Sequence, residues 1–278
     1  MNGRLTAAVG FFVLSLSLRA MTIQLNPTPD LASNPDALAA VQRAADAWAG
    51  FFSNPITIDI NVDMRSMGAW RGLASTTIYY NTYSYDSVRD RLVGDGATHV
   101  DKTVLLSLPT LDQFTTDLYL PSGWSYNGNI RVPAADSKAL GLSGFGGADA
   151  SIAFNTSFSY YYGNAGLPAT EYDLQTAAMH EIGHVLGFSS SVDWVDNLYD
   201  YTGLGMAIYP LDLYHFRTAD LSLAGSDFAN TPRSIEPGVA ASIWDALPHT
   251  QWRPGFLTGM VLRPVTGNGR FTRGRRSA

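Results

Sequence analysis

Two histidines and a glutamate stand in the pattern His-Glu-x-x-His, at His180, Glu181 and His184. On a helix, residues four positions apart lie one turn apart on the same face, so both imidazoles can reach one metal ion. Glu181 projects beside them and can take a proton from metal-bound water without binding the metal. The alternative is an ordinary helix with two metal-free histidines and a solvated Glu181, but the motif favours a catalytic zinc site.

Composition restricts the other ligands of such a site. The chain has no cysteine, which excludes thiolate zinc sites, disulfides, iron–sulfur clusters and a cysteine nucleophile. A catalytic zinc site usually has three protein ligands and an open position for water. The third ligand must therefore be another His, Asp or Glu, and the candidates are His249, Asp193 and His215. His99 stands in a Gly/Asp-rich loop before the motif and is disfavoured.

The motif lies in a strong helical pattern predicted over Glu171 to Gly187. Apolar neighbours anchor this helix in the core and keep the site dry and rigid, which strengthens its electrostatics. These neighbours are Ala177, Ala178, Ile182, Val185 and Leu186. Gly187 breaks the helix shortly after His184.

The stretch His-Glu-x-x-His-x-x-Gly resembles the signature of the metzincin metalloproteases, in which the glycine turns the chain and a histidine follows. Ser190 occupies that histidine position and is a poor zinc ligand, so the short spacing is not met. In leishmanolysin-like metzincins the third histidine comes much later, beside a tryptophan and shortly before a methionine-containing turn. His249 lies 65 residues after His184, Trp252 is nearby, and Met260 follows eleven residues after His249.

This second resemblance implies that His249 is the third zinc ligand and that Met260 lies beneath the metal. The match departs from the family, which has adjacent His and Trp where this chain has His-Thr-Gln-Trp. Asp193 and His215 stay open as ligands, and without His249 as ligand Met260 would be an ordinary core methionine. Val261 and Leu262 follow Met260 where some metzincins carry a tyrosine, so the group that stabilises the oxyanion is unassigned.

The order of elements over roughly residues 22 to 265 also resembles bacterial secreted metalloproteases. The fold implied is α+β and zincin-like, with an N-terminal subdomain over 21–188 and an irregular C-terminal subdomain over 189–267. The first subdomain would hold a twisted mixed sheet and two long helices, including the active-site helix. The second would supply the third zinc ligand and the methionine turn.

Periodicity predicts further elements along the chain. Helices are expected over Pro35 to Phe52, capped by Asn34 with Pro35 at the first position, and over Tyr85 to Leu92. Strands are expected over Met21 to Leu25, Pro55 to Val62, Thr103 to Leu108 and Ser151 to Phe158, and a loop region over 121–150. In zincins an edge strand binds the peptide substrate by strand addition, and Ala153, Phe154 and Asn155 are candidates for that edge unless their strand is a core strand.

Both ends of the chain carry distinctive segments. Arg4 precedes an uncharged run over Leu5 to Leu18, which is shorter than the roughly 20 residues of a membrane span. It is typical of a secretory signal peptide, predicted over 1–20, although a buried helix or an uncleaved anchor is an alternative. The arginine-rich tail over 268–278 is predicted to be disordered and has no apolar anchor, which implies release of the protein.

Charge and composition limit the partners. A net charge of −6 gives no basic footprint for nucleic acid, and 46% hydrophobic residues exclude general disorder. We expect a protein or peptide substrate, no stable membrane anchor after signal removal, and a monomer. Asp193, Asp196 and Asp200 could bind calcium, but their spacing fits no standard loop and favours a polar turn.

These observations predict an exported zinc endopeptidase in which Glu181 is the general base and His180, His184 and His249 hold one Zn²⁺. One alternative is a zincin of another clan, with Asp193 as the third ligand. The other is a secreted binding or adhesion protein whose zinc site is not catalytic.

Overall fold

The computed structural model describes residues 21–52, 54–95, 108–117, 120, 123–142, 146–163, 165–191, 205–214, 216–217 and 233–234. The predicted signal peptide (1–20), most of the strand expected from Thr103 and the basic tail (268–278) lie outside these residues. Within the described residues, no helix has the length and apolar character that a membrane span requires.

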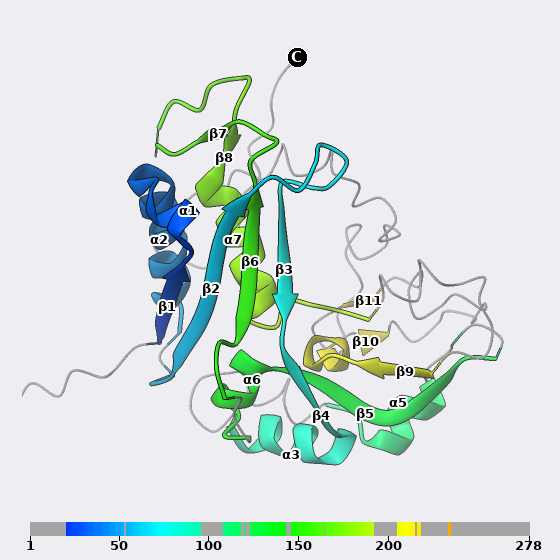
Figure 1. Cartoon of the computed structure of the whole chain (residues 1–278). Coiled ribbons are helices and arrows are strands. Elements are labelled where there is room, and N and C mark those ends of the chain that lie inside the picture. Colours follow the sequence, from blue (N-terminus) through cyan, green and yellow to red (C-terminus); the bar gives the residue numbers. More distant parts are fainter. Residues whose placement is uncertain are drawn as a thin grey trace, which may run out of the picture.

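The main sheet has four strands in the order β1 (Thr22–Pro27), β2 (Thr57–Arg65), β6 (Ala150–Asn155) and β3 (Ala74–Ile78). The first three are parallel, whereas β3 runs antiparallel to β6 and forms one end of the sheet. The sheet is therefore mixed, and Figure 1 shows its twist. This confirms the α+β class and the twisted mixed sheet expected from the sequence.

The strand considered as a substrate-binding edge is a core strand, which is the second of the two possibilities that the sequence left open. Ala153, Phe154 and Asn155 belong to β6, which lies between β2 and β3 and is almost entirely buried. Both sides of its backbone are used by neighbouring strands, so it is a core strand and cannot accept a further strand. The edge strands of this sheet are β1 and β3, and β3 was not among the strands expected from the sequence.

Helices α2 (Pro35–Ala49) and α7 (Leu174–Val185) pack against each other and cover one face of this sheet (Figure 1). The Asn34 side chain accepts a hydrogen bond from the Ala37 backbone amide at 3.1 Å, which confirms the predicted cap. Trp48 donates its indole N–H to the Met179 carbonyl at 2.9 Å and so ties the two helices together. A short helix, α1 (Pro29–Ala32), precedes α2.

A second sheet has the order β4 (Tyr80–Ser84), β5 (Ser125–Pro133) and β9 (Gly205–Ile208). The loop expected over 121–150 is therefore wrong in part, because this segment holds β5 and helix α6 (Ala134–Ala139). The Gly and Pro residues of this segment are typical of a loop, although part of it forms a strand. The apolar residues Ile130 and Val132 of that strand alternate along it and belong to a second hydrophobic core. The other elements here are α3 (Tyr85–Asp95), α5 (Leu111–Asp117) and the 3-10 helix η1 (Pro210–Tyr214).

This second core joins residues from both sides of position 188, where the sequence predicted a subdomain boundary. Tyr85, Val88 and Val132 come from before it, and Met206 and Ile208 come from after it. The described chain also has two short strand pairs, β7 (Tyr160–Tyr161) with β8 (Tyr172–Asp173) and β10 (Phe216–Arg217) with β11 (Arg233–Ser234).

An ion pair links helix α6 to the main sheet. Lys138 of α6 donates to Asp149, at the start of β6, over 2.6 Å and to the Thr57 carbonyl over 2.8 Å. The Asp149 side chain is fully buried, so removal of Lys138 would leave an uncompensated charge in the interior. This pair helps to fix α6, and with it Asp136, relative to the main sheet.

Candidate metal centre

The helix that carries the motif is shorter than predicted and begins at Leu174, because the two preceding residues, Tyr172 and Asp173, form β8. Asp173 caps it by accepting hydrogen bonds from the Gln175 amide at 3.0 Å and the Thr176 hydroxyl at 2.8 Å. The helix ends at Val185, so the motif lies in its last turns.

The two motif histidines face each other on this helix. Their Nε2 atoms lie 3.1 Å apart, and their rings are nearly perpendicular, at 88°. Two nitrogen ligands on one tetrahedral zinc, with bonds of about 2.0–2.1 Å, lie about 3.3 Å apart. The separation therefore fits two ligands of a single zinc ion, although it also fits a direct hydrogen bond between the rings.

A second contact determines which ring nitrogen of His184 is available to a metal. Its Nδ1 lies 2.9 Å from the carbonyl oxygen of Phe188, just past the end of the helix. If Nδ1–H donates to this carbonyl, Nε2 of the neutral ring keeps its lone pair for a metal. Backbone support of this kind orients the ring before the metal binds.

His180 is held towards its neutral form. Burial lowers its pKa below the usual value, and the charge of His184 lowers it further, whereas Glu181 opposes the shift. The neutral imidazole is the form that binds metals. The electrostatics of His180 therefore agree with a role as a metal ligand.

Glu181 is buried beside the pair and is held by a residue that the sequence analysis missed. The Thr76 hydroxyl of β3 lies 2.5 Å from Glu181 Oε2 and 3.3 Å from the Glu181 backbone oxygen. Within the described part of the chain, Oε1 makes no hydrogen bond, so this oxygen can receive a proton. The β-branched and aromatic run around Thr76 (ASTTIYY) was the available signal for this strand.

The outer edge of β3 presents backbone groups that no strand among the described residues pairs with. The Asn155 amide donates to Leu73 and the Tyr79 amide donates to Asp149, so both pairs are hydrogen-bonded across to the β6 side. In an antiparallel ladder such pairs alternate, which directs the N–H and C=O groups of Ala74, Thr76 and Ile78 away from β6. Among the described residues no strand covers this edge, and its central residue is the one that holds Glu181.

The chain leaves the helix through a tightly anchored turn. The Ser190 hydroxyl donates to Asp212 of η1 at 2.5 Å, and the amides of Ser191 and Tyr209 donate to the same carboxylate at 3.0 and 2.9 Å. The Ser190 hydroxyl is thus engaged with a buried carboxylate, in agreement with its dismissal as a zinc ligand. Asp212 is a further residue of this region that the sequence analysis missed.

Gly187 cannot carry a side chain in this turn. Its φ is +89°, and a Cβ would overlap both carboxylate oxygens of Asp136, whose pKa is raised to about 7 by burial. We expect Gly187→Ala to destabilise the fold by about 3 kcal/mol, from the left-handed backbone and the overlap together. Gly166→Ala is the matched control, because its φ is +77° with nothing within 4 Å, and it should cost only about 1 kcal/mol. Urea unfolding measures the loss of stability in both variants. Equal losses would mean that the Asp136 side chain moves aside at no cost.

The remaining predicted site residues lie outside the described residues. These are His249, Asp193, His215 and Met260, together with His99, Asp196, Asp200 and Trp252. Within the described ranges, no three or more His, Asp or Glu side chains gather in a way that could hold a metal. The structure therefore brings together His180, His184 and Glu181, and the third ligand stays a prediction.

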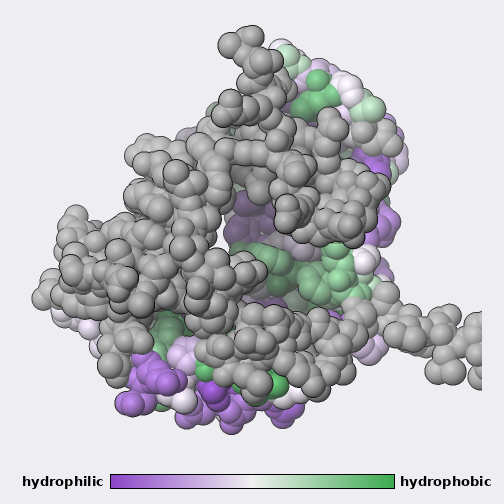
Figure 2. Space-filling model, turned by 180° about the vertical axis from the view of Figure 1, so that it is seen from behind, coloured by the Kyte–Doolittle hydropathy of each residue, from purple (hydrophilic) through white to green (hydrophobic). Residues whose placement is uncertain are grey.

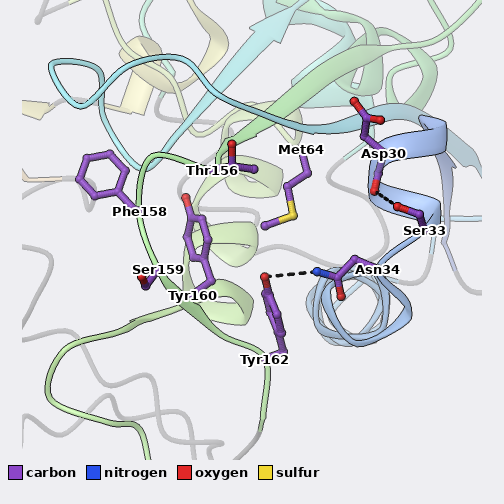
Figure 3. Close-up of a pocket in the computed structure, with 9 residues that line it drawn as sticks. All are labelled: Asp30, Ser33, Asn34, Met64, Thr156, Phe158, Ser159, Tyr160 and Tyr162. Carbon is purple, nitrogen blue, oxygen red and sulfur yellow. Dashed lines mark hydrogen bonds between the residues drawn. The ribbon is translucent and has the colours of Figure 1, made fainter.

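A pocket of about 470 Å³ lies apart from these residues, between the start of α2 and the segment after β6 (Figure 3). It is lined by Asp30, Ser33, Asn34, Met64, Thr156, Phe158, Ser159, Tyr160 and Tyr162. Tyr160 donates its hydroxyl to the Leu73 carbonyl, and burial raises its pKa to about 12, so it stays protonated and supports the start of β3. The pocket shares no residue with the histidine pair, which makes that pair the better candidate for chemistry.

From behind, the described surface mixes hydrophobic and hydrophilic residues (Figure 2). Among the exposed aromatic side chains is Phe188, which is 50% exposed and whose ring lies 5.4 Å from that of Trp48. Since the Phe188 carbonyl contacts His184, this packing supports the backbone that orients the ligand.

Comparison with known proteins adds no relative. No protein-family model, no curated protein and no solved structure matches the chain. The metzincin resemblance therefore depends on the motif residues themselves and on the local geometry described above.

Proposed function

We propose that this chain is an exported zinc-dependent endopeptidase of metzincin type. The observation that carries the proposal is the pairing of two imidazoles, 3.1 Å apart at Nε2, with Glu181 fixed beside them by Thr76. A coincidental pair of histidines would not require a buried carboxylate next to them, held by the edge strand of the sheet.

In this proposal His180, His184 and His249 hold one zinc ion, with Asp193 and His215 as alternatives to His249. When bound, zinc acidifies water and polarises the carbonyl of the bond to be cleaved. Glu181 receives the proton of the attacking water at Oε1 and returns it to the amine nitrogen that leaves. The hydroxyl of Thr76 holds the other carboxylate oxygen throughout, so the proton acceptor keeps its position.

The outer edge of β3 supplies a way to bind the substrate. A peptide in extended conformation can pair with the outward backbone groups of Ala74, Thr76 and Ile78. Such binding is independent of side chains and places the peptide backbone next to Glu181. This agrees with a protein or peptide substrate, and we expect no nucleic acid partner, a monomer, and export directed by residues 1–20.

The test is digestion of casein by the purified chain, with the products identified by mass spectrometry. We expect cleavage at internal peptide bonds, loss of cleavage after a chelator removes the metal, and recovery when zinc is added back. Cleavage that continues in the metal-free protein would contradict the metal-dependent mechanism. Zinc binding without cleavage of any protein or peptide would favour the binding or adhesion alternative.

A further inference from the structure

The loop between β2 and β3, residues 66–73, projects beyond the free edge of the sheet (Figure 1). It leads directly into β3, the strand that holds Glu181 through Thr76. Anything bound along this edge therefore continues towards the loop, which makes the conformation and charge of the loop relevant to substrate choice.

The buried side chain of Asn155 holds the middle of this loop, in addition to the contact of Tyr160 with the Leu73 carbonyl. Asn155 is fully buried and accepts hydrogen bonds from the amides of Met67 at 2.9 Å and Ser157 at 3.1 Å. Its side-chain amide donates to the carbonyls of Gly68 at 2.9 Å and Gly72 at 3.1 Å. Three of the four side-chain hydrogen bonds of Asn155 go to the loop, which is therefore pre-organised.

The tip of the loop carries an exposed aromatic ring and a cation stacked on it. Trp70 is 79% exposed, and the guanidinium of Arg71 lies 4.4 Å from the centre of its ring. The indole lies against Gly68, where a Cβ would be 2.7 Å from Trp70 Nε1 and where φ is +84°. Glycine at position 68 is therefore favoured by the positive φ of the turn and by the close contact with the indole ring.

Arg71 makes no ion pair with any described residue, whereas Arg65, Arg89 and Lys138 all do. Its guanidinium is nevertheless oriented, because it stacks on Trp70. Toward the described residues its side chain donates no hydrogen bond, and an oriented arginine of this kind is suited to bind a carboxylate. The chain is otherwise acidic, with a net charge of −6, so this cation is not part of a general attraction for anions.

The direction of β3 decides which part of a substrate meets Arg71. A substrate strand that pairs antiparallel to β3 places the residues after the scissile bond towards Ala74 and then the loop. Thr76 marks the position of the scissile bond because it holds Glu181. With a rise of about 3.4 Å per residue, the side chains about three to five residues after that bond come within reach of Arg71.

We propose that Arg71, stacked on Trp70, selects substrates with an acidic side chain about three to five residues after the scissile bond. This inference rests on the proposed endopeptidase function and names a substrate class for the same site. The preference comes from a charged hydrogen bond at the loop beside β3, so it affects substrate binding and leaves the chemistry of Glu181 unchanged.

The test uses fluorogenic peptides built on one casein cleavage site, with Glu, Gln or Lys at the third, fourth or fifth position after the scissile bond. Wild type should cleave the best Glu peptide with a kcat/KM about fivefold above its Gln counterpart. Arg71→Gln should abolish this preference, and Arg71→Glu should reverse it in favour of Lys. Arg65→Gln is the matched control, because Arg65 already pairs with Asp63 and should leave the preference unchanged.

Equal cleavage of the Glu, Gln and Lys peptides at every position by wild type, or a preference that survives Arg71→Glu, would overturn the assignment while the endopeptidase function stands. An acidic preference before the scissile bond would overturn the antiparallel orientation. If neither casein nor any peptide is cleaved, the proposed function fails, and binding of the labelled Glu and Lys peptides is measured by fluorescence anisotropy instead. Binding of the Glu peptide that Arg71→Glu reverses would retain Arg71 as an acidic-peptide site, and charge-independent binding would remove it.

Discussion

Replacement of Glu181 by glutamine is expected to lower kcat by about a thousandfold, within the range of 10²–10⁴ that general acid–base catalysis contributes. Glutamine has nearly the same shape as glutamate. Its carbonyl oxygen can still accept a hydrogen bond from the Thr76 hydroxyl, which lies 2.5 Å from Glu181 Oε2 in the wild type. The amide cannot accept a proton, so the water is no longer activated. Stopped assays with a casein peptide measure the rate, and metal analysis should still find one zinc per chain.

The control for this variant is Glu171→Gln, in the segment before β8 and outside the His-Glu-x-x-His motif. It removes the same charge from the same region of the chain and should leave the rate and the zinc content unchanged. If Glu181→Gln kept a rate close to that of wild type, Glu181 could not be the proton acceptor. If it lost zinc as well as activity, Glu181 would be acting as a ligand.

The second large effect concerns the third ligand. We expect His249→Ala to weaken zinc binding by more than about a hundredfold, because loss of an outer-shell partner alone costs about 10- to 100-fold. Only His180 and His184 would then remain to hold the ion. Competition with a chromophoric zinc chelator measures the affinity directly and does not depend on activity.

His215→Ala and Asp193→Ala are the matched variants, since each removes one of the alternative ligands. Full zinc affinity in His249→Ala would contradict the leishmanolysin-like spacing, and the variant that does lose zinc would identify the true ligand. If all three variants kept full affinity, the third ligand would lie elsewhere, and the implied role of Met260 would fall with that of His249.

Local features of the site could be predicted from the sequence. Asn34 and Pro35 begin α2 because capping depends on neighbouring residues, and His180 and His184 share a face because helical geometry fixes their spacing. The mixed α+β class also follows from the alternation of short apolar strands with two amphipathic helices. These inferences need no knowledge of which distant segments meet.

Features that depend on distant contacts could not be predicted. Thr76 contacts Glu181 across 105 positions of sequence, and Asp212 contacts Ser190 across 22. The alternating pattern around Ala153 and Phe154 shows that this strand has two faces, but it does not show which strands lie beside it. The sequence alone therefore allows both an edge strand and an interior strand. Strand β5 was missed because its Gly and Pro residues suggest a loop until its pairing with β4 and β9 is known.

The central claim is that one zinc ion, held by the histidine pair and a third ligand, makes this chain a peptidase. The most direct measurement is a titration of the metal-free protein with zinc, in which bound zinc and casein cleavage are recorded in the same samples. The account predicts that the rate rises in proportion to bound zinc and levels off at one equivalent. Tight binding of one zinc with no cleavage of casein or of a broad peptide library would contradict it.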